Sequence, residues 1–183
     1  DAAAPLTVAQ STVEPLYRKI SARAEELNYE LQVEPNILTE DADLHLMTDT
    51  GHVLRPLRKT GNTSLFMVTG RVKSVQIVSN ASRPCDTVGP FVDDRRTLGV
   101  LIGSITLYDS QGTVPLVRHL EDSALPGWNN LEAVPMRWTE GSAFLALHRR
   151  DPSGLGMLVI DVHAAGPYLK TTQKPFTLKA FRA

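Results

Sequence analysis

Hydrophobic positions near the start of the chain recur with the period of an α-helix. The spacing of three to four residues leaves charged side chains on the other faces, which predicts an amphipathic helix over 13–27. Thr12 is expected to cap this helix, with Pro15 in its first turn, where a missing N–H costs nothing. The rest of the domain must then cover the apolar stripe. The residues of this stripe are Val13, Leu16, Tyr17, Ile20, Ala24 and Leu27.

After residue 41 the hydrophobic period changes to two, which is typical of β-strands. Residues 98–108 are the most apolar segment and predict a central strand, and 157–162 predict another buried strand. A turn signal at 49–51 predicts a hairpin. This pattern predicts a mainly β fold, an antiparallel β-sandwich of jelly-roll type with one N-terminal amphipathic helix. The other predicted strands lie near 44–46, 53–57, 65–68, 72–77, 113–117, 143–147 and 168–181.

The chain of 183 residues has the length of one main domain. We expect residues 1–41, the helix and a polar connector, to pack on a β-sandwich domain formed by residues 42–183. Two long loops, 83–96 and 119–135, separate the predicted strands. The sequence begins at Asp1 without a methionine or a signal-like segment, so we expect a processed product or an excised piece.

Charge and hydropathy exclude two classes of partner. With 19 basic and 20 acidic side chains the net charge is −1, so the chain has no strong field for nucleic acid or for an anionic membrane. Its longest apolar runs, 98–105 and 156–162, are much shorter than the ~20 residues of a membrane-spanning helix. We therefore expect neither nucleic-acid binding nor a membrane span.

The residues that could carry catalysis are scattered. The single cysteine, Cys85, excludes an internal disulfide, and the five histidines lack the close spacing of a compact metal site. Nucleophile-elbow, phosphate-loop and zinc-protease motifs are absent from the sequence. Asp93 and Asp94 are adjacent and point in opposite directions on an extended chain, so they cannot form the carboxylate pair of a glycosidase. We expect a non-catalytic protein without a metal ion or cofactor.

Two tryptophans suggest a sugar-binding surface. An indole ring offers a flat apolar face to the C–H groups of a sugar, while amides and charged side chains bind its hydroxyls. An alternative is that both rings plug the open ends of the sandwich. The candidate ligand-binding residues are Trp128, Asn129, Arg137 and Trp138, with Asp93 and Arg95 as hydrogen-bonding partners.

Several runs resemble a known family. The most specific are D-D-R-R-T-L-G-V at 93–100 and R-W-T-E-G at 137–141, supported by P-G-W at 126–128 and by the runs 43–46 and 75–79. Together they resemble the region that follows the Hint (hedgehog/intein) domain in bacterial proteins, chiefly of acetic-acid bacteria and their relatives. The resemblance extends from Ala4 to Tyr168.

This resemblance implies a location and partners but no chemistry. It implies a secreted or cell-surface bacterial protein, with a preceding Hint domain as a possible partner. The acyl-shift chemistry of Hint domains belongs to that preceding module. Cys85 lies in the middle of this chain, so it cannot be the first residue of a Hint module. The R-W-T-x-G string is also similar to β-sandwich segments attached to bacterial glycosyltransferases and other carbohydrate-related proteins.

Three functions follow from these observations. The favoured one is a non-catalytic module that binds a polysaccharide or glycan. The second is recognition of the acceptor in Hint autoprocessing, because the region after the hedgehog autoprocessing domain supplies the acceptor nucleophile. The third is protein–protein association, including self-association, through an unpaired strand edge or a flat face.

Overall fold

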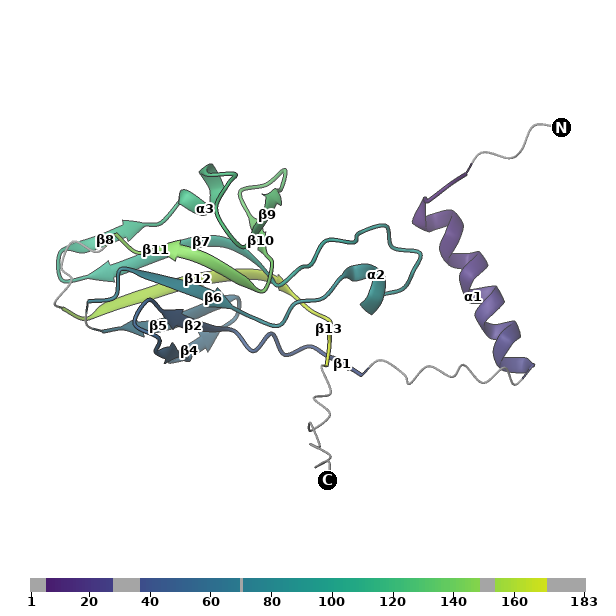
Figure 1. Ribbon diagram of the computed structural model, residues 1–183, viewed down its shortest axis with the longest axis horizontal. Helices are drawn as coiled ribbons and strands as arrows, with labels where there is room; N and C mark the ends of the chain where they lie inside the picture. The colour runs from purple at the N-terminus through teal and green to yellow at the C-terminus, as the bar shows by residue number, and fades with distance from the viewer. Residues whose placement is uncertain (1–5, 28–36, 70, 149–153, 171–183) are drawn as a thin grey trace, which may run out of the picture.

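The computed structural model describes residues 6–27, 37–69, 71–148 and 154–170 (Figure 1). Strands hold 41% of the structure and helices 17%, so the protein is mainly β, and its paired strands are antiparallel. One long helix lies near the N-terminus, as predicted. The predicted strand residues 171–181, most of the predicted connector and residues 1–5 lie outside the described part of the chain.

The larger sheet has seven strands in the order β4-β5-β12-β7-β10-β9, with β8 added on β7. Its two longest strands, β7 and β12, pair along most of their length, which confirms that 98–108 supplies a central strand. Alternate residues of β5 are buried, as expected when one face of a strand meets the core. The strands of this sheet are β4 (Arg58–Thr60), β5 (Thr63–Val68), β7 (Val100–Asp109), β8 (Gly112–Pro115), β9 (Trp128–Leu131), β10 (Arg137–Thr139) and β12 (Gly156–Ala165).

The smaller sheet has four strands in the order β11-β6-β2-β3. The predicted hairpin joins β2 to β3, and its turn uses Gly51 at φ +84°, a conformation that favours glycine. Strand β11 pairs with β6 along its full length. The strands of this sheet are β2 (His45–Thr48), β3 (Val53–Leu54), β6 (Ser74–Val78) and β11 (Ser142–Ala146).

A single cluster of buried apolar side chains draws on both sheets. Leu46 and Ile77 come from the smaller sheet, while Phe66, Ile102 and Leu158 come from the larger one, and each of the five is fully buried. The alternation of buried and half-buried positions along β5 and β6 places every second side chain in this cluster. Burial of this shared apolar surface is the main force that holds the sheets together.

Four short elements lie outside the two larger sheets. Strand β1 (Leu38–Thr39) pairs with β13 (Tyr168–Leu169), so the two ends of the described β region are joined. The long loops contain two short helices that the sequence pattern did not predict, α2 (Pro84–Thr87) and α3 (Arg118–Glu121). Proline suits the first turn of α2 because no hydrogen bond is required of its nitrogen there.

Helix α1 (Gln10–Glu26) begins earlier than predicted. The N–H groups of Thr12 and Val13 both donate to the carbonyl of Ala9, at 2.9 and 3.0 Å, so Thr12 lies inside the helix and the predicted cap is wrong. Glu14 accepts hydrogen bonds from Gln10 and from Arg18, each one turn away, and this ladder favours the earlier start.

The β sheets do not cover the apolar stripe of α1. None of its residues is buried, and α1 lies to one side of the sheets, close to the loop that carries α2 (Figure 1). The ring of Tyr17 meets the ring of Phe91 in that loop, with centroids 5.5 Å apart. The expectation that the main domain covers the stripe is therefore wrong for most of its length among the described residues.

Candidate functional site

The two tryptophans lie at the edge formed by β9 and β10. In this pair Thr139 is opposite Trp128, and both are buried. Neighbouring residues of a strand point to opposite faces, so Trp138 lies on the other face of β10, where it is half-buried. The indoles of Trp128 and Trp138 therefore cannot form one binding platform.

The side chain of Trp128 is part of the buried core. Only 5% of its surface is exposed, its Nε1–H donates to the carbonyl of Phe144 at 2.9 Å, and its ring lies 5.0 Å from that of buried His119. The preceding Gly127 has φ +78°, and a Cβ there would lie 1.9 Å from the carbonyl oxygen of Ser142. The predicted exposed indole at this position is wrong, because the close approach of the strands directs Trp128 inward.

Arg137 is fully buried and satisfied by backbone carbonyls. Its guanidinium donates to the carbonyls of Asn129, His119, Asp122 and Ser123, the last three at 3.0, 2.7 and 2.9 Å. Burial lowers the pKa of Arg137, while the carboxylates of Asp122 and Glu140 act in the opposite direction. With its donors used in this way, Arg137 is placed to hold loops together.

Asn129 is also part of this framework. Its side-chain N–H donates to the carbonyl of Thr97 at 2.9 Å, and its own carbonyl accepts from Arg137. The structure thus brings two predicted residues together, Asn129 and Arg137, but through structural hydrogen bonds. They connect the loop before β7 to strands β9 and β10.

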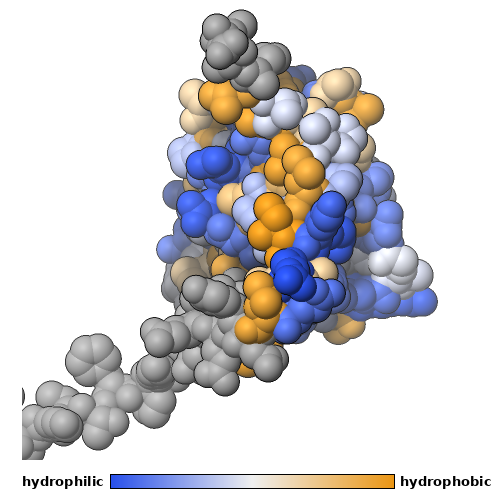
Figure 2. Space-filling view, turned by 90° about the vertical axis from the view of Figure 1, so that its right-hand side faces the viewer, coloured by the Kyte–Doolittle hydropathy of each residue, from blue (hydrophilic) through white to orange (hydrophobic). Residues whose placement is uncertain are grey.

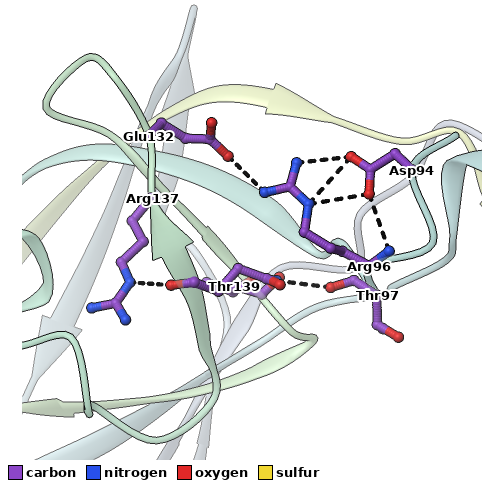
Figure 3. A network of polar contacts seen from close by, with 7 residues as sticks. Asp94, Arg96, Thr97, Glu132, Arg137 and Thr139 are labelled. Carbon is purple, nitrogen blue, oxygen red and sulfur yellow. Dashed lines mark hydrogen bonds and ion pairs between the residues drawn. The ribbon is translucent and has the colours of Figure 1, made fainter. Parts of the chain in front are cut away.

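The acidic and basic residues at 93–96 form ion pairs with one another, Arg95 with Asp93 and Arg96 with Asp94. Arg96 binds Asp94 through two nitrogens, Nη2 lying 2.8 Å from Oδ2, and its third nitrogen reaches Glu132 at 2.9 Å (Figure 3). These hydrogen bonds raise the pKa of Arg96, and the guanidinium lowers that of Asp94. The network fixes the loop against the β9–β10 connection.

Asp93 and Arg95 lie on the surface. Their side chains are 57% and 82% exposed, and Arg95 Nε lies 3.8 Å from a carboxylate oxygen of Asp93. An exposed pair of this kind contributes little to stability. Both groups are free to meet a partner from solution, but no measured contact joins them to either tryptophan among the described residues.

Trp138 lines a hollow, here called the Trp138 hollow, at the end of the sheets. The cavity measures about 140 Å³ and lies between the α2 loop, β10 and β13. Tyr168 closes one wall, and its hydroxyl donates to the carbonyl of Gly99 at 2.7 Å. Burial raises the pKa of this hydroxyl. The hollow is lined by Ser82, Pro84, Thr87, Val88, Leu98, Gly99, Trp138, Gly166, Pro167 and Tyr168.

A wider and more polar hollow, here called the Arg83 hollow, adjoins it. It measures about 390 Å³ and shares Ser82 with the Trp138 hollow. Arg83 and Asp86 on its rim form an ion pair at 2.7 Å, which raises the pKa of Arg83. Its lining consists of Ala81, Ser82, Arg83, Asp86, Thr97 and Leu169. Its polar members Ser82, Arg83 and Asp86 lie in a segment without hydrophobic period, so periodicity did not indicate them.

Two larger hollows lie elsewhere. One of about 490 Å³ lies between β8, α3 and the end of β11, and one of about 410 Å³ lies beside β3. Within the described part of the chain, neither is lined by a tryptophan, tyrosine or phenylalanine. Among these hollows, the Trp138 hollow joins aromatic rings to hydroxyl side chains, and the charged side chains of Arg83 and Asp86 lie in the adjoining Arg83 hollow.

Two features of the described residues bear on metal ions and on membranes. No group of three or more histidine, cysteine, aspartate or glutamate side chains gathers there in a way that could hold an ion. Equally, no helix among those residues is long and apolar enough to cross a bilayer.

Comparison with known proteins adds no relative. The chain matches no family model, no curated protein and no solved structure. The likeness to the region after Hint domains stays a prediction from the sequence.

Proposed function

We propose that this chain is a non-catalytic accessory module that binds carbohydrate at the Trp138 hollow, in a secreted or cell-surface bacterial protein. The observation that carries the proposal is the half-buried indole of Trp138 in the wall of a hollow whose rim bears hydroxyl groups. An indole face binds the C–H face of a sugar ring. Ser82 and Thr87 beside it can exchange hydrogen bonds with sugar hydroxyls.

The adjoining Arg83 hollow extends the proposed site. The Trp138 hollow alone is smaller than the roughly 300–1,000 Å³ of typical ligand sites. A ligand longer than one sugar ring would reach past Ser82 to the ion pair of Arg83 and Asp86, whose side chains are 55% and 32% exposed. A guanidinium and a carboxylate supply directed donors and acceptors for hydroxyl groups. We therefore expect an oligosaccharide or polysaccharide.

The framework for this site is proposed to be a β-sandwich. Residues of both larger sheets belong to one buried cluster, which is the arrangement of two sheets packed face to face. The Arg137 and Arg96 networks fix the loops at its end, so the hollow is supported by rigid elements. The jelly-roll order of connections stays a prediction.

Retention on immobilised polysaccharide tests the proposal. The full chain is passed over cellulose, levan and bacterial surface polysaccharide. Trp138→Ala should weaken retention roughly tenfold or more, while Trp138→Phe should keep part of it because an aromatic face remains. Arg83→Ala should weaken retention to a smaller extent. Arg58→Ala, an exposed arginine on β4, is the matched control and should have no effect.

Two results would overturn the proposal. One is the absence of retention on every polysaccharide by the wild-type chain. The other is equal retention of the wild type and Trp138→Ala, with both shown to be folded by their unfolding curves.

A further inference from the structure

The apolar stripe of α1 has a solvent-facing edge that no function described so far uses. Leu16, Ile20 and Leu27 are 58%, 69% and 57% exposed, and we call these three residues the outer seam. Figure 2 shows apolar side chains running down this helix, between charged ones, on the side turned away from the sheets. Large apolar side chains gathered in one row on a surface are typical of an interface.

Another face of the helix makes the contact with its own domain. The ring of Tyr17 packs against the ring of Phe91, and the guanidinium of Arg18 lies over the same Phe91 ring, 5.7 Å from its centroid. Phe91 is itself 5% exposed and packs over Gly89, where a Cβ would lie 2.3 Å from its ring. This contact leaves the outer seam uncovered by the residues that the structure describes, so the seam is open to a partner.

The spacing of the outer seam fits a second helix. Its members follow one another by four and seven residues, and Arg23 occupies the place between Ile20 and Leu27, which completes the four-three-four steps of a coiled-coil contact. Arg23 is held by Glu26 at 2.8 Å, so its charge is compensated beside the seam. Most of the stability of a helix in a protein comes from packing of its apolar face, so pairing would also stabilise α1.

The charge of α1 indicates which kind of partner fits the outer seam. Helix α1 carries three basic side chains, Arg18, Lys19 and Arg23, and three acidic ones, Glu14, Glu25 and Glu26. A helix that binds anionic lipid bears an excess of basic residues on its polar face, and α1 has none. A balanced helix, with Glu14 and Arg18 paired at 2.6 Å, meets no net repulsion from its own copy.

We propose that α1 of one molecule pairs with α1 of a second copy along the outer seam. Such a two-fold contact uses the same surface on both molecules. Three large side chains from each copy form an interface well below the standard size of about 1,600 Å². The dimer is therefore weak and depends on concentration.

Sedimentation velocity of the full chain tests this pairing from micromolar to near-millimolar concentrations. We expect the wild type to shift from monomer to dimer within this range. Ile20→Glu should keep the chain monomeric throughout, because a charge in the seam is desolvated on pairing. Ala22→Glu adds the same side chain and the same single charge at an exposed position on the opposite side of the helix, and should dimerise as the wild type does.

A crosslinking measurement covers the case in which Ile20→Glu unwinds the helix. In a Cys85→Ser background, Ile20→Cys should form a disulfide-linked dimer faster than Lys19→Cys. Three results would overturn the pairing: a wild type that is monomeric at all concentrations, a dimer that Ile20→Glu leaves intact, or equal crosslinking at both positions. A monomer that instead sediments with anionic vesicles would assign the seam to a membrane surface and would equally overturn it.

Discussion

A guanidinium surrounded by backbone carbonyls explains why Arg137 is not available to a ligand. It donates to four carbonyls that belong to three segments, the α3 region, the loop after it and strand β9. A buried charge is tolerated only when its donors are used in this way. Arg137 therefore holds these three segments together at the end of the sheets that bears the proposed site.

Replacing Arg137 by methionine should lower the free energy of unfolding by about 3 kcal/mol, because several buried carbonyls lose their donor. Arg95→Met, at a site 82% exposed, should change stability by less than about 0.5 kcal/mol. Urea unfolding of both variants measures the difference. Equal midpoints for Arg137→Met and the wild type would contradict the structural role of Arg137.

A buried histidine makes stability depend on pH. His119 is fully buried, its Nε2–H donates to the carbonyl of Gly103 at 2.7 Å, and burial lowers its pKa from the ordinary value of 6.5. In the unfolded chain His119 takes up a proton near pH 6.5, but in the folded protein only at lower pH. Acidification below about pH 6.5 therefore favours the unfolded state.

The free energy of unfolding should accordingly fall between about pH 7 and pH 5, before the carboxylates titrate. His119→Gln, which keeps a donor for Gly103 but cannot become charged, should flatten this fall. His52→Gln, at an exposed position, should leave it unchanged. A wild-type stability that is constant over this range would contradict the assignment of His119 as a buried neutral side chain.

The sequence indicates which residues have side chains suited to a sugar, but not whether these side chains point into the core or to the surface. Trp128, Asn129 and Arg137 have side chains suited to sugars, yet strand alternation and the tight approach at Gly127 place Trp128 and Arg137 inside. The sequence pattern of so short an edge strand does not reveal which face is buried. Trp138 is the predicted residue that lines a hollow.

Among the elements, strand β7 and its neighbourhood follow closely from the sequence. Gly99 and Gly103 interrupt the apolar run at 98–108, and glycines inside a strand pattern predict close packing or a bulge. A Cβ at Gly99 would lie 2.4 Å from Thr139 Oγ1, and one at Gly103 would lie 2.5 Å from Nε2 of His163, so the prediction is confirmed. Close packing against neighbouring residues therefore explains both glycines without a nucleotide-binding loop.

The two glycines differ in what surrounds them. At Gly99 the obstructing atoms include the backbone nitrogen of Gly141 at 2.9 Å, whereas at Gly103 they belong to the exposed side chain of His163. Gly99→Ala should therefore cost roughly 1–3 kcal/mol of stability, and Gly103→Ala much less, because His163 can rotate away. Thermal unfolding of the two variants checks this order, and the reverse order would contradict the packing described for β7.

Helix α1 and the two long loops show where the element-scale prediction ends. Periodicity predicted a helix and its apolar stripe, but it carries no information on whether the same chain covers that stripe. The short helices α2 and α3 lie in segments without period and depend on contacts with distant strands. The 49–51 hairpin and the central strands were predictable because turn residues and alternation are local signals.

At the scale of the whole molecule, the proposed sugar site and the outer seam are separate features. The hollow is formed by the α2 loop, β10 and β13, whereas the seam lies on α1. Pairing of two copies would give one particle two sugar sites, and two weak sites on one particle bind a polysaccharide more tightly than one. The two proposals nevertheless fail independently, since neither uses a residue of the other.

The indole N–H signals in a two-dimensional nitrogen–proton NMR spectrum test the central claim most directly. The chain has two tryptophans, and Trp128 is a built-in reference because its N–H is buried and bonded to Phe144. Adding an oligosaccharide from a retained polysaccharide should shift the Trp138 signal, assigned with Trp138→Phe, and leave that of Trp128 in place. A saturating titration that leaves Trp138 unshifted, or that moves Trp128 alone, would contradict carbohydrate binding at this hollow.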